Sequence, residues 1–348
     1  MKAAVIKKPG VIEIETVPTP EPGPGEVLLK VEACALCGTD QRVLSGEKHV
    51  DVSIVGHEIT GTVAALGQGV KGIRQGQRFI VQTVIGCGAC PMCKIHRENL
   101  CEKGFIAMGY QFNGGFAEYL IMPQVAVDQG CLIPIPDDLP AEIGTLIEPL
   151  SCCVNGMKYI PLEQTEHVVI FGGGIIGVLN GLVARARGAR VVTIMDVSQA
   201  RLDLLRKLGL PFDHLVNSGK ISPAAWVKDA TGGRGVDAVV VAASVKALVT
   251  QGIGLLRRAG HLSVFAGMPK SDPVEPVDLN KIHYLELNLH GANSSSQADY
   301  LQARDFLVSG KIDGRPLVTH RFPLNRFLEA VKIQSDPSQG SLKIIILP

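Results

Sequence analysis

Four cysteines of this 348-residue chain lie within one stretch of fifteen residues, with the spacing Cys-x2-Cys-x2-Cys-x7-Cys. Four thiolates at such a spacing suit tetrahedral zinc, and a closed all-cysteine site leaves no position for a substrate. An iron–sulfur cluster uses the same kind of ligands and is the alternative. The sequence therefore predicts a structural zinc site made of Cys87, Cys90, Cys93 and Cys101.

Other possible metal ligands lie far apart in the chain. Cys37 follows a β-like segment, His57 and Glu58 come about twenty residues later, and Glu148 lies much further on. Cysteine, histidine and glutamate are ligands of catalytic zinc sites, which keep one position open. Each also has a structural alternative: Cys37 as a small core residue, His57 as a structural histidine, and Glu148 as a carboxylate at a helix start.

A glycine-rich loop follows the apolar segment 168–171 and precedes an apolar helical segment. The sequence from Gly172 to Gly177 is G-x-G-x-x-G, the fingerprint of a dinucleotide-binding turn. In that motif Gly172 permits the turn, Gly174 lets the backbone approach a pyrophosphate, and Gly177 lets helix and strand pack closely. The start of the helix, at Ile175 and Ile176, offers unpaired N–H groups to the anion.

An acidic residue ends the next predicted strand, where a dinucleotide site needs it. Asp196 lies 19 residues after Gly177, and a carboxylate there binds the ribose hydroxyls of NAD and repels the 2′-phosphate of NADP. Arg201 is nearby, but no second basic residue adjoins Asp196. We therefore expect NAD as the cofactor, bound by Gly172, Gly174, Ile175, Ile176, Gly177, Asp196 and Arg201.

The elements that must position these residues fall into three zones. Short alternating strands with Pro/Gly turns fill the chain up to about residue 153, and strands alternating with helices fill 155–291. Six strand candidates and the helices between them predict a doubly wound parallel sheet. The remaining tail is too short for its own core. We therefore expect one domain from 1–154 plus 292–348, with a nucleotide domain, 155–291, inserted in it.

Composition excludes several classes of protein. The formal net charge is +1, so the chain lacks the basic footprint of nucleic-acid binding. Hydrophobic residues make up 46%, which is too many for a disordered chain, and no apolar run reaches the length of a membrane span. We expect a cytoplasmic protein without nucleic-acid or membrane partners.

These motifs together resemble the zinc-containing medium-chain alcohol dehydrogenases, closest to the branch with sorbitol, threonine and galactitol-1-phosphate dehydrogenases. The resemblance implies a GroES-like β domain with an inserted Rossmann domain, two zinc ions per chain, NAD, and a homodimer or homotetramer. The matching segments run in family order through most of the chain: 37–40, 56–58, the four-cysteine loop, 114–119, 148–151, the glycine loop with Asp196, and 231–237.

The resemblance also assigns roles in a catalytic zinc site. It implies that Cys37, His57 and one glutamate hold the metal, with Glu58 and Glu148 competing for the third place. The other glutamate would be bridged by water or exchange with the first. Thr39 matches the hydroxyl that takes the alcohol's proton, and the Asp40 carboxylate would orient a ligating imidazole.

The expected reaction is oxidation of a secondary alcohol of a polyol or sugar alcohol to the ketone. The sequence departs from the family at two places. Arg42 stands where several relatives have a relay histidine, so the proton must leave by another route. Residues 291–295 lack the Arg-Tyr pair of sorbitol dehydrogenases, which disfavours sorbitol itself as the substrate. Alternatives are an amino alcohol such as threonine, or a phosphorylated polyol whose phosphate faces Arg42. A zinc-free quinone reductase and a non-catalytic nucleotide-binding protein are disfavoured, because no metal ligand is missing.

Overall fold

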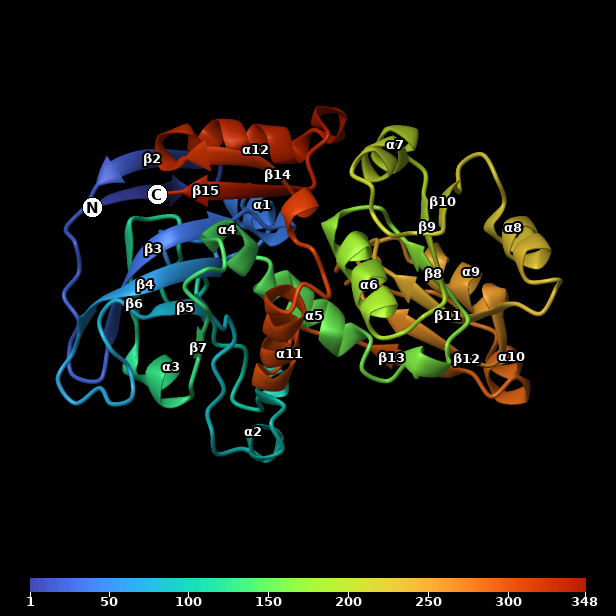
Figure 1. Ribbon diagram of the computed structural model, residues 1–348, viewed down its shortest axis with the longest axis horizontal. Coiled ribbons are helices and arrows are strands. Elements are labelled where there is room, and N and C mark those ends of the chain that lie inside the picture. The colour runs from blue at the N-terminus through green and yellow to red at the C-terminus, as the bar shows by residue number, and fades with distance from the viewer. The chain divides into compact units, whose positions relative to one another are not determined.

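The computed structural model describes residues 1–348, apart from the side chain of residue 337. The chain forms two compact units, and the first consists of two separate stretches, Met1–Ser151 and Ser294–Pro348. The second unit is the intervening stretch, Cys152–Asn293. Each unit has its own sheet (Figure 1).

The first unit is built on a seven-stranded sheet of order β14-β15-β3-β4-β5-β7, with β6 also paired to β3. All pairs in this sheet are antiparallel except β14 with β15. The strand β15, near the end of the chain, pairs with β3, near the beginning of the chain (Figure 1). A hairpin of β1 and β2 stands apart from this sheet. The strands are β1 (Lys2–Lys8), β2 (Val11–Thr16), β3 (Val27–Ala35), β4 (Glu58–Leu66), β5 (Arg78–Val81), β6 (Tyr119–Met122), β7 (Leu132–Pro134), β14 (Val318–Pro323) and β15 (Lys343–Leu347).

Short helices surround this sheet and start near several of the predicted site residues. The core of this sheet is apolar, with Leu29, Ile59, Phe116 and Phe327 fully buried. The helices are α1 (Gly38–Leu44), α2 (Pro91–Lys94), α3 (Gln124–Asp128), α4 (Ala141–Gly144), α11 (Gln297–Val308), α12 (Phe327–Ser335) and α5 (Ile147–Gly156), which begins in this unit and ends in the other.

The second unit is a six-stranded parallel sheet of order β10-β9-β8-β11-β12-β13. Strands and helices alternate along the chain, and the sheet order reverses beside β8, as in doubly wound folds. The predicted parallel α/β sheet is thereby confirmed. Its elements are β8 (His167–Phe171), α6 (Ile175–Ala186), β9 (Val191–Asp196), α7 (Gln199–Lys207), β10 (His214–Asn217), α8 (Pro223–Ala230), β11 (Val236–Val241), α9 (Ala247–Leu255), β12 (Leu256–Val264), α10 (Leu279–Tyr284) and β13 (Asn288–Gly291).

Two details of this unit differ from the sequence pattern. The pattern favours a helix over 246–258, but the chain turns into β12 at Leu256, because parallel pairing of Leu256 with Val236 outweighs local helix propensity. The other is the short helix α10, which the pattern does not indicate. Its start is capped by the Asp278 carboxylate, which accepts hydrogen bonds from the amides of Asn280 and Lys281, and its Ile282 packs against the core.

No helix in the part of the chain that the structure describes is long and apolar enough to cross a membrane. The longest helices just given have 12 residues, well short of the roughly 20 that a bilayer requires.

Candidate zinc and dinucleotide sites

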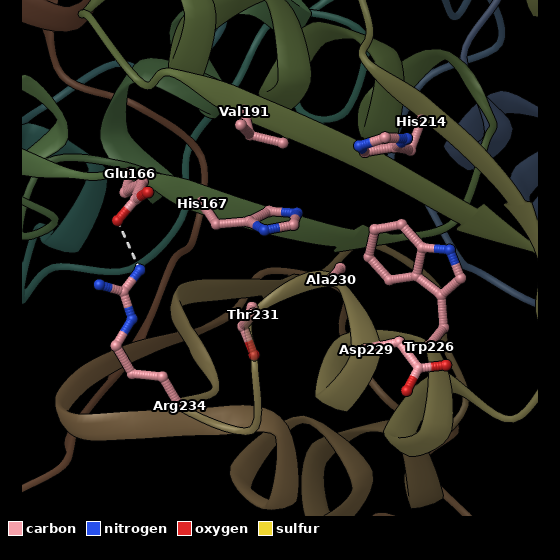
Figure 2. A pocket seen from close by; sticks show the side chains of 9 residues that line it. All are labelled: Glu166, His167, Val191, His214, Trp226, Asp229, Ala230, Thr231 and Arg234. Carbon is pink, nitrogen blue, oxygen red and sulfur yellow. Dashed lines mark hydrogen bonds and ion pairs between the residues drawn. The ribbon is translucent and has the colours of Figure 1, made fainter.

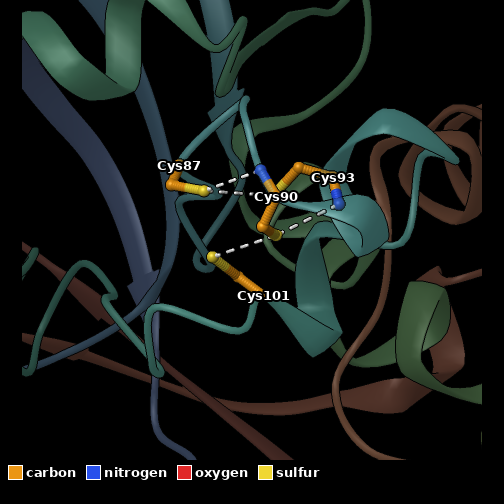
Figure 3. Close-up of side chains that lie close together, drawn as sticks. All are labelled: Cys87, Cys90, Cys93 and Cys101. Atoms are coloured by element: carbon orange, nitrogen blue, oxygen red, sulfur yellow. Dashed lines mark hydrogen bonds between the residues drawn. The ribbon is translucent and has the colours of Figure 1, made fainter.

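The structure brings the four cysteines of the loop together, as Figure 3 shows. Their sulfurs all lie within 4.8 Å of one another, and the Cys87–Cys93 and Cys90–Cys101 pairs are both 3.9 Å apart. All four are free cysteines, and these separations are far longer than the roughly 2.05 Å of a disulfide. Four sulfurs placed about 2.3 Å from a zinc ion lie about 3.8 Å from each other. The arrangement therefore fits a tetrahedral metal site.

The pKa values of two thiols in this loop also fit a site for a cation. The amides of Ala89 and Cys90 lower the pKa of the Cys87 thiol to about 6. Burial and hydrogen bonds with the neighbouring thiols raise the pKa of Cys93 to about 12. Four sulfurs this close cannot all be thiolates unless a cation offsets their charge, which is what a bound zinc ion does.

A second group of possible ligands lies where β3 ends and β4 begins in the first unit. The strands β3 and β4 are antiparallel, with Ala35 opposite Glu58, so the residues after β3 meet the residues at the start of β4. This register places the Cys37 sulfur, a His57 ring nitrogen and a Glu58 carboxylate oxygen within 4.8 Å of one another. The residue before His57 must be glycine, because a Cβ on Gly56 would lie 2.8 Å from the Cys34 sulfur.

Asp40 connects two members of this group. Its Oδ2 accepts a hydrogen bond of 2.9 Å from the Cys37 amide as part of the cap of α1. Its Oδ1 lies 3.3 Å from His57 Nδ1, which leaves Nε2 as the nitrogen available to a metal. Burial lowers the pKa of His57, but the charges of Tyr110 and Asp40 outweigh it and raise that pKa well above the usual value.

Glu58 is fully buried, and its two oxygens differ in their surroundings. Its Oε2 forms an ion pair with Lys343, and neither oxygen has a hydrogen-bond partner among the described residues. Burial raises the pKa of the Glu58 carboxyl, and Lys343 opposes that rise. A buried carboxylate oxygen without a donor is costly. Beside a thiolate and an imidazole, it is well placed to bind a divalent cation.

Two other predicted residues lie close to this group without joining it. Glu148 is buried in the first turn of α5, and its charge helps to raise the pKa of Glu58, but its oxygens are not part of the 4.8 Å group. Thr39 is half-buried in the first turn of α1, with its amide 3.5 Å from the Cys37 sulfur. Arg42 is exposed and pairs with Glu47 at 2.8 Å.

The structure adds residues that the motifs did not indicate. The ring of Tyr110 is 5.5 Å from that of His57, and the Lys48 ammonium lies 4.3 Å from the centre of the Tyr110 ring. The most informative addition is Lys343, which is 2% exposed and contacts Glu58. A lone lysine before the apolar run Ile-Ile-Ile-Leu was the sequence signal that could have drawn attention to it.

The glycine loop of the second unit has the geometry of a phosphate-binding turn. Gly172 has φ +110°, and a Cβ on Gly177 would lie 1.8 Å from the Gly172 carbonyl oxygen. No side chain caps the start of α6, so its first amides remain available to an anion. Asp196 accepts hydrogen bonds from the amides of Gly173 at 2.7 Å and Ser198 at 2.8 Å.

Arg201 lies at the same loop, since a Cβ built on Gly174 would be 3.6 Å from one of its guanidinium nitrogens. The structure therefore brings together all the residues that the sequence predicted for the dinucleotide site, at the carboxyl ends of β8 and β9.

A cavity of about 850 Å³ in the same unit lies elsewhere. Figure 2 shows its lining, which includes His167, Val191 and His214, the first residues of β8, β9 and β10. Trp226 contacts both histidine rings. This cavity therefore opens at the amino ends of the strands, opposite the glycine loop.

Comparison with known proteins agrees with this geometry. Residues 23–137 match the alcohol dehydrogenase GroES-like domain, and residues 176–309 match the zinc-binding dehydrogenase family. The chain is 31% identical to L-threonine 3-dehydrogenase of Rhizobium etli, covering 98% of this chain and 97% of that protein. It is 30% identical to sorbitol dehydrogenase of Bacillus subtilis, covering 100% and 97%.

A solved structure is similar over the whole chain. A zinc-binding dehydrogenase from Sinorhizobium meliloti 1021, bound to NADP, has a TM-score of 0.88 and 30% identity, covering 100% of this chain and 99% of that one. The fold is thus a GroES-like domain with a Rossmann-type domain, as predicted. The chain belongs to the zinc-binding alcohol dehydrogenases, and it is an NAD(P)-linked enzyme of that family.

Proposed function

We propose that this enzyme oxidises a secondary alcohol of a polyol or sugar alcohol to the ketone, with NAD as the hydride acceptor. Cys37, His57 and Glu58 would hold a catalytic zinc ion, and the four-cysteine loop would hold a structural one. Bound zinc would supply a Lewis acid that makes the substrate hydroxyl more acidic. Bound NAD would supply the ring that accepts the hydride.

The chain's own residues have distinct parts in this proposal. Thr39, in the first turn of α1, would accept the proton released by the alcohol. Asp40 holds His57 through Nδ1, at 3.3 Å, and so fixes the direction of Nε2. Asp196, Arg201 and the amides at the start of α6 would bind the dinucleotide. The Asp196 carboxylate disfavours a 2′-phosphate, which supports NAD over NADP.

One observation carries the proposal: a thiol from one segment and an imidazole and a buried carboxylate from another converge within 4.8 Å, and the carboxylate oxygens have no hydrogen-bond partner among the described residues. Glu148 is the nearby carboxylate that would exchange with Glu58 or reach the metal through water.

A second candidate substrate is an alcohol that carries an anionic group, such as an amino acid or a sugar-alcohol phosphate. The observation in its favour is the Lys48 ammonium, which lies over the ring of Tyr110, and that ring is 5.5 Å from the His57 ring. Arg42 favours it less, because its guanidinium is already paired with Glu47.

Metal analysis combined with a substrate panel tests both proposals. The wild-type enzyme should contain two zinc ions per chain and reduce NAD with a sugar alcohol, its phosphate or threonine, followed by NADH absorbance. Cys37→Ser should contain about one zinc ion and lose turnover while still binding NAD. Cys34→Ser, which changes a buried cysteine outside both clusters, is the matched control. Full activity in Cys37→Ser would refute the zinc assignment.

A homodimer or homotetramer, which the family resemblance implies, and a cytoplasmic location also belong to this proposal. Light scattering of the purified enzyme tests the first, and a monomer at micromolar concentration would contradict it.

A further inference from the structure

Lys343 is one of the most deeply buried charged residues of the first unit. It is the first residue of β15 and is 2% exposed. A buried ammonium is costly unless its charge and its N–H groups find partners. Its position therefore requires an explanation beyond the packing of β15.

The partners of Lys343 lie at the candidate zinc site. Its Nζ donates a hydrogen bond of 3.1 Å to the carbonyl oxygen of Leu36, the residue before Cys37. It also forms an ion pair with Glu58 Oε2. The sheet fixes this geometry, because β15 and β4 flank β3 and all three strands meet where β3 ends.

The ion pair leaves the two oxygens of Glu58 unequal. Oε2 is the oxygen that pairs with the Lys343 ammonium, whereas neither oxygen has a hydrogen-bond partner among the residues that the structure describes. A carboxylate can bind a metal through one oxygen or through both. A cation bound to Oε2 favours binding through Oε1 alone, which would keep a coordination position open.

Local charge supports the same assignment. A Cys37 thiolate and a Glu58 carboxylate together neutralise a divalent ion, and Asp40 and Glu148 place two more carboxylates nearby. Lys343 supplies a positive charge within this acidic group. Its loss would leave Glu58 free to bind the metal through both oxygens or to turn away from it.

We propose that Lys343 is a positioning residue that holds Glu58 by Oε2, so that Glu58 presents only Oε1 to the catalytic zinc. This inference rests on the proposed zinc site. In this inference Lys343, which lies outside every sequence motif, controls how the Glu58 carboxylate binds the metal.

Cobalt substitution tests the coordination directly. Co²⁺ in place of zinc gives visible bands that are strong for four-coordinate sites and weaker for five-coordinate ones. Lys343→Met should weaken these bands and shift them to shorter wavelength, while the contribution of the four-cysteine site stays the same and cancels in the difference spectrum. Release of the metal to a chelator should be about tenfold faster or more.

Two variants separate positioning from a general loss of packing. Lys343→Arg retains the cation and should restore most of the wild-type spectrum and release rate. Ile345→Ala opens a space in the same strand without touching Glu58, since Ile345 is fully buried and apolar. It should lower the Tm but leave the cobalt spectrum unchanged. Should Lys343→Met not fold, Lys343→Gln, which keeps a donor but no charge, replaces it with the same expected changes.

The outcomes distinguish this inference from the proposal beneath it. If Cys37→Ser abolishes the catalytic-site bands but Lys343→Met and Lys343→Gln keep the wild-type spectrum and release rate, the role of Lys343 is refuted and the zinc site stands. If Cys37→Ser changes neither metal content nor spectrum, the zinc site itself is refuted, and the role of Lys343 with it.

Discussion

The Asp196 carboxylate has two sets of hydrogen-bond partners: backbone amides of the protein and, in the proposed complex, the ribose hydroxyls of NAD. Its carboxylate accepts hydrogen bonds from the amides of Gly173 and Ser198, which fixes the acid at the mouth of the glycine loop. The same oxygens would accept hydrogen bonds from the ribose hydroxyls of NAD. The proposed selectivity for NAD would follow from charge, since a 2′-phosphate would approach a carboxylate that is already held in place.

Asp196→Asn should therefore weaken NAD binding about tenfold, equivalent to about 1.4 kcal/mol, and weaken NADP binding much less. Titration of the purified enzyme with each dinucleotide measures both dissociation constants. Asp203→Asn, an exposed change on α7 next to Arg206, is the control and should alter neither. An unchanged ratio of the two constants would remove Asp196 from the ribose contact.

At the scale of single residues, the sequence was sufficient to predict those sites whose residues lie close together along the chain. The glycine loop with Asp196 and the cysteine loop are assembled by neighbouring residues, so their types and separations were sufficient. The contact between Lys343 and Glu58 joins residues 285 positions apart through the register of three strands. No local pattern encodes that register, and the contact is visible only in the folded chain.

The junction between β8 and α6 depends on Gly177. A Cβ there would lie 1.8 Å from the carbonyl oxygen of Gly172, and backbone cannot yield as a flexible side chain can. Gly177→Ala should push α6 away from the strand, cost about 3 kcal/mol or more of stability, and abolish dinucleotide binding.

Gly254→Ala is the matched control for this change, because Gly254 also lies in a helix, α9, and a Cβ there meets no atom within 4 Å. It should leave binding unchanged and stabilise the protein by up to about 1 kcal/mol. Urea unfolding and NAD titration of both variants give the comparison. Normal NAD affinity in Gly177→Ala would show that the loop tolerates the shift.

The cysteine loop is an element that has little core of its own. Ile95 and Leu100 are exposed. The helix α2 has only four residues and none of them is buried, although its N-cap residue Cys90 is. The structure of the loop must therefore come largely from its metal. The sequence predicts both the ligand set and a polar loop with little core, and the exposed side chains agree with the second prediction.

Cys90→Ser should reduce the zinc content from two ions per chain to about one. Trypsin should then cut near Lys94 and Arg97 about tenfold faster or more, because the loop opens when its metal is lost. Metal analysis and timed digestion check this. Cys131→Ser, a buried cysteine outside the cluster, should retain both ions and the wild-type digestion rate. Equal digestion rates for the two variants would argue against a structural metal.

At the scale of the whole molecule, the two units can be followed separately. The chain has a single tryptophan, Trp226, and it lies in the second unit against the rings of His167 and His214. Its fluorescence therefore reports the unfolding of that unit. Sequence zoning predicted an inserted parallel sheet from alternating strands and helices. It did not predict that the histidines at the amino ends of the strands would share a cavity with this ring, because three separate β-strand starts create that arrangement.

Three histidines of the second unit, His167, His261 and His290, should make that unit sensitive to acid. Burial lowers the pKa of His167, aided by the nearby His214, and burial also lowers the pKa values of His261 and His290. In the unfolded chain these rings take up protons near pH 6.5, whereas in the folded unit they do so only at lower pH. Between those values the unfolded state binds more protons, so stability falls as pH falls below about 6.5.

The Tm followed by Trp226 fluorescence should thus be lower at pH 5.5 than at pH 7.5, and His167→Gln should reduce that difference by on the order of a few degrees. His49→Gln, an exposed change in the other unit, should leave the difference as it is in the wild type. His167→Gln also retains a side chain able to bond to the Thr193 hydroxyl, which His167 Nε2 contacts at 2.8 Å. A pH dependence unaltered by His167→Gln would mean that this ring is as readily protonated in the folded unit as in the unfolded chain.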